Sequence, residues 1–213
     1  MSLNKNTGIL IDRAINELRT GRPIVLEEKR NYWIFYNIEH ATKIIINKFK
    51  SIQDKETYLL ITKQKAKQLL PIKSNSNIFF QVSSNFNHSK FQDLFLNPAN
   101  KTNILNLKNH NLTKSKLFHN YALELSKNAK LIPALIFKKI NSKFNDDIDS
   151  VLFDMGLLKF KYSDLLNQNK HISDSIKLVS SANVPLPYVE DSFFKIYKSY
   201  IGSHQHMAII INP

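Results

Sequence analysis

Two neighbouring glutamates are the first residues along the chain that could do chemistry. Glu27 and Glu28 directly follow the apolar segment 23–26 (PIVL), which predicts a short buried strand. Carboxylates at the C-terminal end of a strand often serve α/β proteins as metal ligands or as acid–base groups. An ordinary polar turn has the same composition, so spacing alone leaves both interpretations open.

Histidines and a cluster of aspartates are the other candidates. His204 and His206 are separated by one residue, so both rings would face the same side of a strand and could bind a metal. No third ligand accompanies them, and exposed residues at a hairpin end are the simpler interpretation. Asp146, Asp147 and Asp149 stand at the start of a predicted helix, where negative charge complements the helix dipole.

The composition excludes several classes of site. The chain of 213 residues has no Cys, which excludes disulfides, cysteine zinc sites and thiol catalysis. It has four Gly, with none between Gly21 and Gly156, so neither a phosphate-binding P-loop nor a dinucleotide fingerprint can lie in that stretch. No nucleophile-elbow motif is found either.

The chain is strongly basic, with 30 Lys and Arg against 17 Asp and Glu, a formal net charge of +13. This balance raises the alternative of a basic nucleic-acid- or protein-binding module without enzymatic activity. Aromatic residues among lysines could stack on bases, although core packing explains them more simply; they are Phe79, Phe80, Phe86, Phe91 and Phe95, near Lys73 and Lys90. Because the lysines are spread along the chain, we favour compositional drift over nucleic-acid binding.

No segment approaches the ~18 apolar residues that a membrane-spanning helix needs. The N-terminal sequence also lacks the apolar run of a signal peptide. We therefore expect a soluble, cytoplasmic protein with no membrane partner.

Strand and helix patterns alternate along the chain and predict a layered α/β (α+β) domain. Helices are predicted around 11–18, 41–49, 62–70, 91–95, 117–130 and 146–157. Strands are predicted at 23–26, 33–36, 58–61, 78–82, 104–107 and 133–137, and a short strand and turn at 160–166 and 173–176. Thr62 is a predicted N-cap and Gly21 a predicted helix terminator. Leu117, Tyr121 and Leu125 are predicted to face inward, with Phe118 as a further candidate.

The alternation of helices and strands ends near residue 177, and three β segments follow at 177–180, 193–197 and 207–211. Three strands form a poor independent core. We therefore divide the chain into a domain at 1–176 and a short β-rich segment at 177–213.

Several segments resemble the 3,4-dihydroxy-2-butanone 4-phosphate synthase domain of bifunctional riboflavin-biosynthesis proteins. The segments are IDRAINELRTGRPIVL, ITKQKAKQLLPI and YALELSKNAKLIPALIF. The segment LVSSANVPLPYVEDSFFKIYKSYIGSHQHMAIII resembles the linker and truncated start of a GTP cyclohydrolase II domain. The resemblance implies a mixed sheet flanked by helices, a homodimer, and a lyase that acts on ribulose 5-phosphate.

That family binds Mg2+ through a Glu and a His and uses further acidic residues to move protons. By resemblance, Glu27, Glu28 and His119 are the catalytic and metal-binding candidates, here vestigial. The acidic loop is shortened to EEKRNY, and Trp33 replaces an Asp. Lys139 stands where the family has a catalytic Glu.

The change to Lys139 reverses a charge beside the expected cation. Two unit charges ~4 Å apart interact by ~4 kcal/mol at an effective dielectric constant near 20. We therefore expect a pseudoenzyme, a synthase homologue with impaired or lost catalysis that would need Mg2+ if active. Reconstruction of a working site by His119 with Glu27 or Glu28 is the competing hypothesis. GTP cyclohydrolase II activity is not expected, because its zinc-binding Cys residues are missing.

Overall fold

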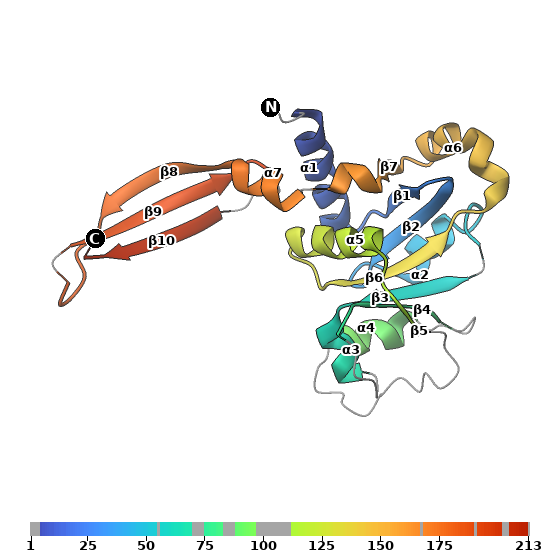
Figure 1. Ribbon diagram of the computed structural model, residues 1–213, viewed down its shortest axis with the longest axis horizontal. Helices are drawn as coiled ribbons and strands as arrows, with labels where there is room; N and C mark the ends of the chain where they lie inside the picture. The colour runs from blue at the N-terminus through green and yellow to red at the C-terminus, as the bar shows by residue number, and fades with distance from the viewer. Residues whose placement is uncertain are drawn as a thin grey trace. The chain divides into compact units, whose positions relative to one another are not determined.

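The computed structural model divides the chain into two compact units, which are described separately (Figure 1). The larger unit is Arg13–Leu166, and the smaller combines Met1–Asp12 with Asn167–Pro213. The structure describes residues 5–54, 56–69, 75–82, 88–96, 112–166, 168–189, 191–201 and 205–212. The strand predicted at 104–107 lies outside these ranges.

A mixed seven-stranded sheet forms the centre of the larger unit, in the order β5-β4-β3-β6-β2-β1-β7. Its strands are antiparallel to their neighbours except for β1 and β7, which are parallel. The predicted layered fold with a mixed sheet is therefore confirmed. The strands are β1 (Ile24–Glu28), β2 (Asn31–Asn37), β3 (Thr57–Ile61), β4 (Ile78–Val82), β5 (Leu112–Lys114), β6 (Ala134–Lys139) and β7 (Leu158–Lys161).

Helices begin and end where short polar side chains and glycine allow it. Thr42 and Thr62 accept hydrogen bonds from the backbone N–H groups three residues later, each at 3.3 Å, so the predicted N-cap at Thr62 is confirmed. Gly21 follows the first helix with φ +77°, the left-handed conformation that glycine adopts without strain. The helices are α1 (Lys5–Arg19), α2 (Lys43–Lys48), α3 (Lys63–Leu69), α4 (His88–Leu96), α5 (Leu117–Asn128) and α6 (Ile148–Asp154), with 3-10 turns at Ser142–Asp147 and Tyr162–Leu165.

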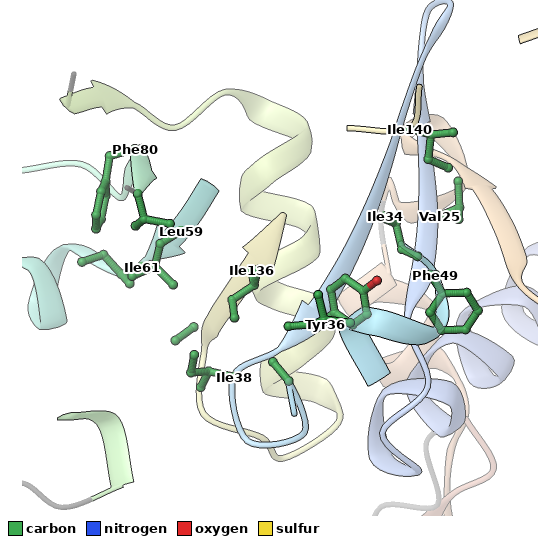
Figure 2. Close-up of a cluster of buried hydrophobic side chains, with 14 of the residues drawn as sticks. Val25, Ile34, Tyr36, Ile38, Phe49, Leu59, Ile61, Phe80, Ile136 and Ile140 are labelled. Carbon is green, nitrogen blue, oxygen red and sulfur yellow. The ribbon is translucent and has the colours of Figure 1, made fainter. Parts of the chain in front are cut away.

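The sheet is covered on both faces. One face packs against buried residues of α2, α3, α4 and α6, and Figure 2 shows part of this cluster, including Tyr36, Ile136 and Phe80. The other, which we call the α5 face, packs against α5 and carries Leu26, Phe35 and Phe137. Alternation of side chains along each strand creates these two sets. β6 lies at the middle of the sheet and is buried on both faces, as its continuous apolar run predicts.

Two local predictions are wrong. Leu117 is predicted to face inward but is 60% exposed, whereas Leu125 and Phe118 are buried as predicted; the buried residues of α5 are Phe118, His119, Ala122, Leu123, Leu125 and Ser126. The segment 173–176 is predicted as a turn, but its first half ends helix α7 (Gln168–Asp174), and the turn is at Ser175. A segment with one isolated apolar residue carries too little periodicity to distinguish a helix from a turn.

The smaller unit contains a three-stranded antiparallel sheet in the order β10-β9-β8, in which the three strands lie side by side (Figure 1). They are β8 (Ile176–Asn183), β9 (Ser192–Ser199) and β10 (Gln205–Ile211), so all three predicted C-terminal strands are present. Ser175 and Ser199 are buried and share a short hydroxyl–hydroxyl hydrogen bond.

Across the described residues, no helix is long and apolar enough to cross a membrane.

Asn37 joins the end of β2 to α5 and to the approach to β6. Its side-chain amide donates to Ser126 Oγ at 2.7 Å and to the Ile132 carbonyl at 2.8 Å, and Asn37 is 2% exposed. Its own oxygen accepts from the Glu39 N–H at 2.9 Å. The Ser126 hydroxyl also donates to the Ile132 carbonyl at 3.2 Å, so these groups form one hydrogen-bond network around Asn37.

We expect Asn37→Ala to lower the free energy of unfolding of the larger unit by about 2 kcal/mol, because buried partners lose their hydrogen bonds. Urea unfolding followed by the fluorescence of Trp33, the single Trp of the chain, measures this loss. Asn47→Ala, at an exposed position of α2, is the matched control and should change stability by less than about 0.5 kcal/mol. Equal effects of the two substitutions would contradict the assignment.

Candidate functional site

A cavity of about 390 Å³ opens on the α5 face of the larger unit. Most of its wall is aromatic, and no Asp or Glu contributes to it. Its lining residues are Trp33, Tyr58, Phe79, Phe80, Gln81, Thr113, Lys114, Lys116, Phe118 and His119. The wall therefore differs in chemistry from the acidic magnesium site that the family resemblance implies.

Strand register brings the aromatic wall together. Trp33, Tyr58 and Phe79 alternate onto the same face of β2, β3 and β4, as their pairing with Lys139, Phe137 and Leu60 shows. The rings of Tyr58 and Phe79 stack with centroids 5.0 Å apart, and Trp33 meets Tyr58 edge-on at 5.6 Å. These are the distances at which aromatic pairs attract one another.

His119 lies in the first turn of α5 and is 2% exposed. Its ring stacks on Phe79 at 3.9 Å and contacts Phe118 at 4.0 Å. Its Nδ1 accepts a hydrogen bond from the Lys116 backbone N–H at 3.1 Å. Burial, together with the charge of Lys116, lowers the pKa of His119 to about 3, so the imidazole is neutral at physiological pH.

The hydrogen bond at Nδ1 decides the tautomer of His119. A nitrogen that accepts a hydrogen bond carries a lone pair, so the proton of the neutral ring resides on Nε2. That Nε2–H is buried, and so is the indole N–H of Trp33; neither finds a hydrogen-bond partner in the described part of the chain. Two residues of the cavity lining thus carry buried donors that lack acceptors among the described residues.

Two lysines give the cavity wall a positive charge, since Lys114 and Lys116 both contribute to the lining and are exposed. Tyr58 stays protonated, because burial and its 2.6 Å hydrogen bond to Glu56 raise its pKa to about 12. Glu56 is an exposed residue outside the lining. The cavity therefore presents donors and cations to a ligand.

Glu27 points to the face opposite the cavity. It pairs across β1 and β2 with Tyr32 and lies 3.7 Å from the ammonium of Lys159, which also contacts Asp149 at 2.5 Å. Burial opposes the charge on Lys159, but the hydrogen bond to Asp149 and the charges of Asp149 and Glu27 together outweigh it, and the pKa of Lys159 is raised. Glu27 and Asp149 therefore belong to an ion-pair network at the sheet edge.

Glu28 alternates onto the α5 face, but the register places it far from His119. It pairs with Asn31, four residues along β2 from Phe35, the partner of Phe137. With strands ~4.8 Å apart and ~3.3 Å per residue, Glu28 and Phe137 are about 16 Å apart at their Cα atoms. The ring of His119 contacts Phe137 at 5.5 Å, so the structure does not bring Glu28 and His119 together.

Lys139 ends β6 on the α5 face, directly opposite Trp33 of β2. Its neighbour Lys138 points to the other face, is 8% exposed and donates to the Asp54 carbonyl at 3.3 Å. Burial lowers the pKa of Lys138, with partial compensation by Asp54. Two adjacent lysines therefore end the strand on which the sequence resemblance would place a glutamate.

The residues of this site do not suit magnesium. Mg2+ prefers oxygen ligands, chiefly carboxylates, and a histidine can bind a metal only through a lone pair. His119 presents an N–H instead, and no group of three acidic or histidine residues that could hold a metal occurs in the described ranges. All Asp and Glu residues of 13–166 lie within those ranges. Of the predicted pair, His206 is exposed on β10 and His204 lies outside the described residues.

The sequence analysis missed most of the cavity wall. Trp33, Tyr58 and Phe79 were placed in predicted strands and Phe118 in a predicted helix, but none of them was predicted to line a site, and Lys116 was not singled out. The alternation within β2 and β4 signals that Trp33 and Phe79 each face one side. Which strands are neighbours was not readable, so their convergence could not be predicted.

Comparison with solved structures identifies the fold. RibBX from A. baumannii, a two-domain 3,4-dihydroxy-2-butanone 4-phosphate synthase, superposes with a TM-score of 0.57 at 15% identity, covering 94% of this chain and 69% of that protein. The Candida albicans synthase gives a TM-score of 0.54 at 12% identity, covering 74% and 95%. A synthase in complex with two magnesium ions gives 0.56 at 10% identity, covering 76% and 97%.

The chain therefore has the fold of 3,4-dihydroxy-2-butanone 4-phosphate synthase, as the sequence resemblance predicts. No protein-family model and no curated protein matches the sequence. Identities of 10–15% establish the fold and carry no information on activity.

The neutrality of His119 makes stability depend on pH. The unfolded chain protonates this imidazole below its ordinary pKa of about 6.5, whereas the folded protein does not until about pH 3. Between these values the unfolded state binds more protons, so stability falls as the pH falls.

We expect His119 to contribute a loss of about 2 kcal/mol in the free energy of unfolding between pH 7 and pH 4.5. Urea unfolding at both pH values measures the loss in the wild type and in His119→Gln, which has no titrating group there. The difference between the two proteins should shrink toward acid pH. A pH-independent difference would show that His119 titrates normally.

Proposed function

We propose that this protein is a homologue of 3,4-dihydroxy-2-butanone 4-phosphate synthase that keeps the fold and has lost the magnesium-dependent reaction on ribulose 5-phosphate. The observation that carries the proposal is the hydrogen bond from the Lys116 N–H to His119 Nδ1. It leaves a donor where a metal would need a lone pair.

The distribution of charge supports the same conclusion. Glu27 is paired with Lys159 on the far face, Glu28 is remote in register, and Lys139 ends β6 opposite Trp33. A cation placed on the α5 face would meet lysines and aromatic rings in place of carboxylates. The fold alone does not indicate a loss of catalysis, and it does not indicate nucleic-acid binding either. The proposal therefore depends on the residues of the α5 face.

We further propose that 177–213 corresponds to the start of a second, GTP cyclohydrolase II-like domain, following a synthase-like domain at 1–176. The two-domain RibBX covers 94% of this chain, whereas the Candida albicans synthase covers 74%. The compact units of the structure divide differently, at Asp12 and Asn167. The homodimer implied by the resemblance is also part of this proposal, and light scattering coupled to gel filtration tests it.

We expect no formate when the protein is incubated with ribulose 5-phosphate and Mg2+ at millimolar concentration. An enzyme-coupled formate assay measures the product, and the Candida albicans synthase serves as the positive control. Isothermal titration with Mg2+ should give no saturable binding below about 10 mM, because the α5 face offers no carboxylate cluster.

Formate release with turnover, together with magnesium binding at millimolar concentration or better, would overturn the proposal. Lys139→Glu provides a sharper variant, since it restores one carboxylate at the family position. It should remain inactive, because His119 still carries its proton on Nε2 and offers a metal no lone pair there. Activity in this variant alone would show that charge reversal, and not the tautomer, silences the site.

A further inference from the structure

The cavity on the α5 face is built to accept a ligand other than a metal-bound sugar phosphate. His119 and Trp33 both line the cavity, His119 is 2% exposed, and neither the Nε2–H of His119 nor the indole N–H of Trp33 finds an acceptor among the described residues. Buried donors without acceptors cost free energy, so such groups normally indicate a partner. Two such N–H donors on residues that line one cavity indicate a ligand with acceptor atoms.

The aromatic lining of the cavity favours a ligand that is flat and apolar. Tyr58 and Phe79 are stacked at 5.0 Å with an interplanar angle of 5°, and Trp33 stands edge-on to both. Aromatic faces attract other rings by stacking, whereas they leave the hydroxyl groups of a sugar without hydrogen bonds. A volume of about 390 Å³ is within the range of small-molecule sites.

The charge of the wall specifies an anion. Lys114 and Lys116 belong to the lining, which contains no carboxylate. Glu56 is engaged by the Tyr58 hydroxyl, and Asp54 raises the pKa of Tyr58 from nearby, so these acids adjoin β3 without entering the lining. An anionic group on the ligand would be attracted to the lysines.

We propose that this cavity binds a planar heteroaromatic anion. Its ring lies against the aromatic wall, its carbonyl oxygens accept from His119 Nε2 and Trp33 Nε1, and its anionic group lies toward Lys114 and Lys116. This inference rests on the proposed loss of the metal site, because the His119 imidazole that would bind a metal acts here as a hydrogen-bond donor to the ligand.

Orotate, a pyrimidine carboxylate, is the probe, and it is compared with uracil, ribulose 5-phosphate and inorganic phosphate by isothermal titration. We expect orotate to bind at least tenfold more tightly than any of the three. The indole N–H resonance of Trp33, the single Trp, should move downfield on binding in a 15N-correlated spectrum. No orotate binding below 10 mM, or equal binding of ribulose 5-phosphate, overturns the proposal.

Substitutions distinguish the contributions of the N–H donor and of the lysine charge to orotate affinity. Trp33→Phe keeps a ring and removes the N–H, and should weaken orotate binding about fivefold. Lys116→Gln should weaken it about threefold, with Lys127→Gln, an exposed lysine of the same helix outside the lining, as the matched control. Should Trp33→Phe fail to fold, the lysine pair still decides, and equal affinities of Lys116→Gln and Lys127→Gln contradict the model.

The two proposals can fail separately. Formate release would disprove the loss of catalysis and leave orotate binding to be judged by titration. Absence of orotate binding, with no formate released, would disprove the heteroaromatic ligand and leave the loss of catalysis standing.

Discussion

One hydrogen bond determines the chemistry of the larger unit. The Lys116 N–H at the start of α5 donates to His119 Nδ1, and a neutral imidazole so engaged exposes an N–H at its other nitrogen. A histidine that binds a metal through Nε2 has the reverse arrangement, with Nδ1 donating and Nε2 open. A contact that belongs to helix capping therefore converts a potential metal ligand into a hydrogen-bond donor.

Burial reinforces this choice. His119 is enclosed by Phe79, Phe118 and Phe137, so protonation would place a charge in an apolar environment next to Lys116. The desolvation cost keeps the ring neutral over the physiological range. Helix capping, aromatic packing and tautomer thus form one coupled arrangement, in which a change to any part alters what the cavity can bind.

The same fold carries magnesium in a solved synthase, yet the polar groups here are distributed differently. The carboxylate of Glu27 is engaged by Lys159 on the face away from the cavity, and the end of β6 carries Lys138 and Lys139. The hydrophobic framework that produces the sheet is independent of these positions. Because the framework does not depend on these polar positions, the fold can be kept at 10–15% identity while the residues of the site differ.

The sequence by itself determined the layered α/β fold, most of the strands and helices, and the helix boundaries at Thr62 and Gly21. These depend on local periodicity and capping, which act over a few residues. Only the tertiary structure decided how far Glu28 lies from His119, that His119 is buried against Phe79, and that Trp33 and Phe79 line one cavity. Those outcomes depend on strand order and register between segments 40 or more residues apart, about which local patterns carry no information.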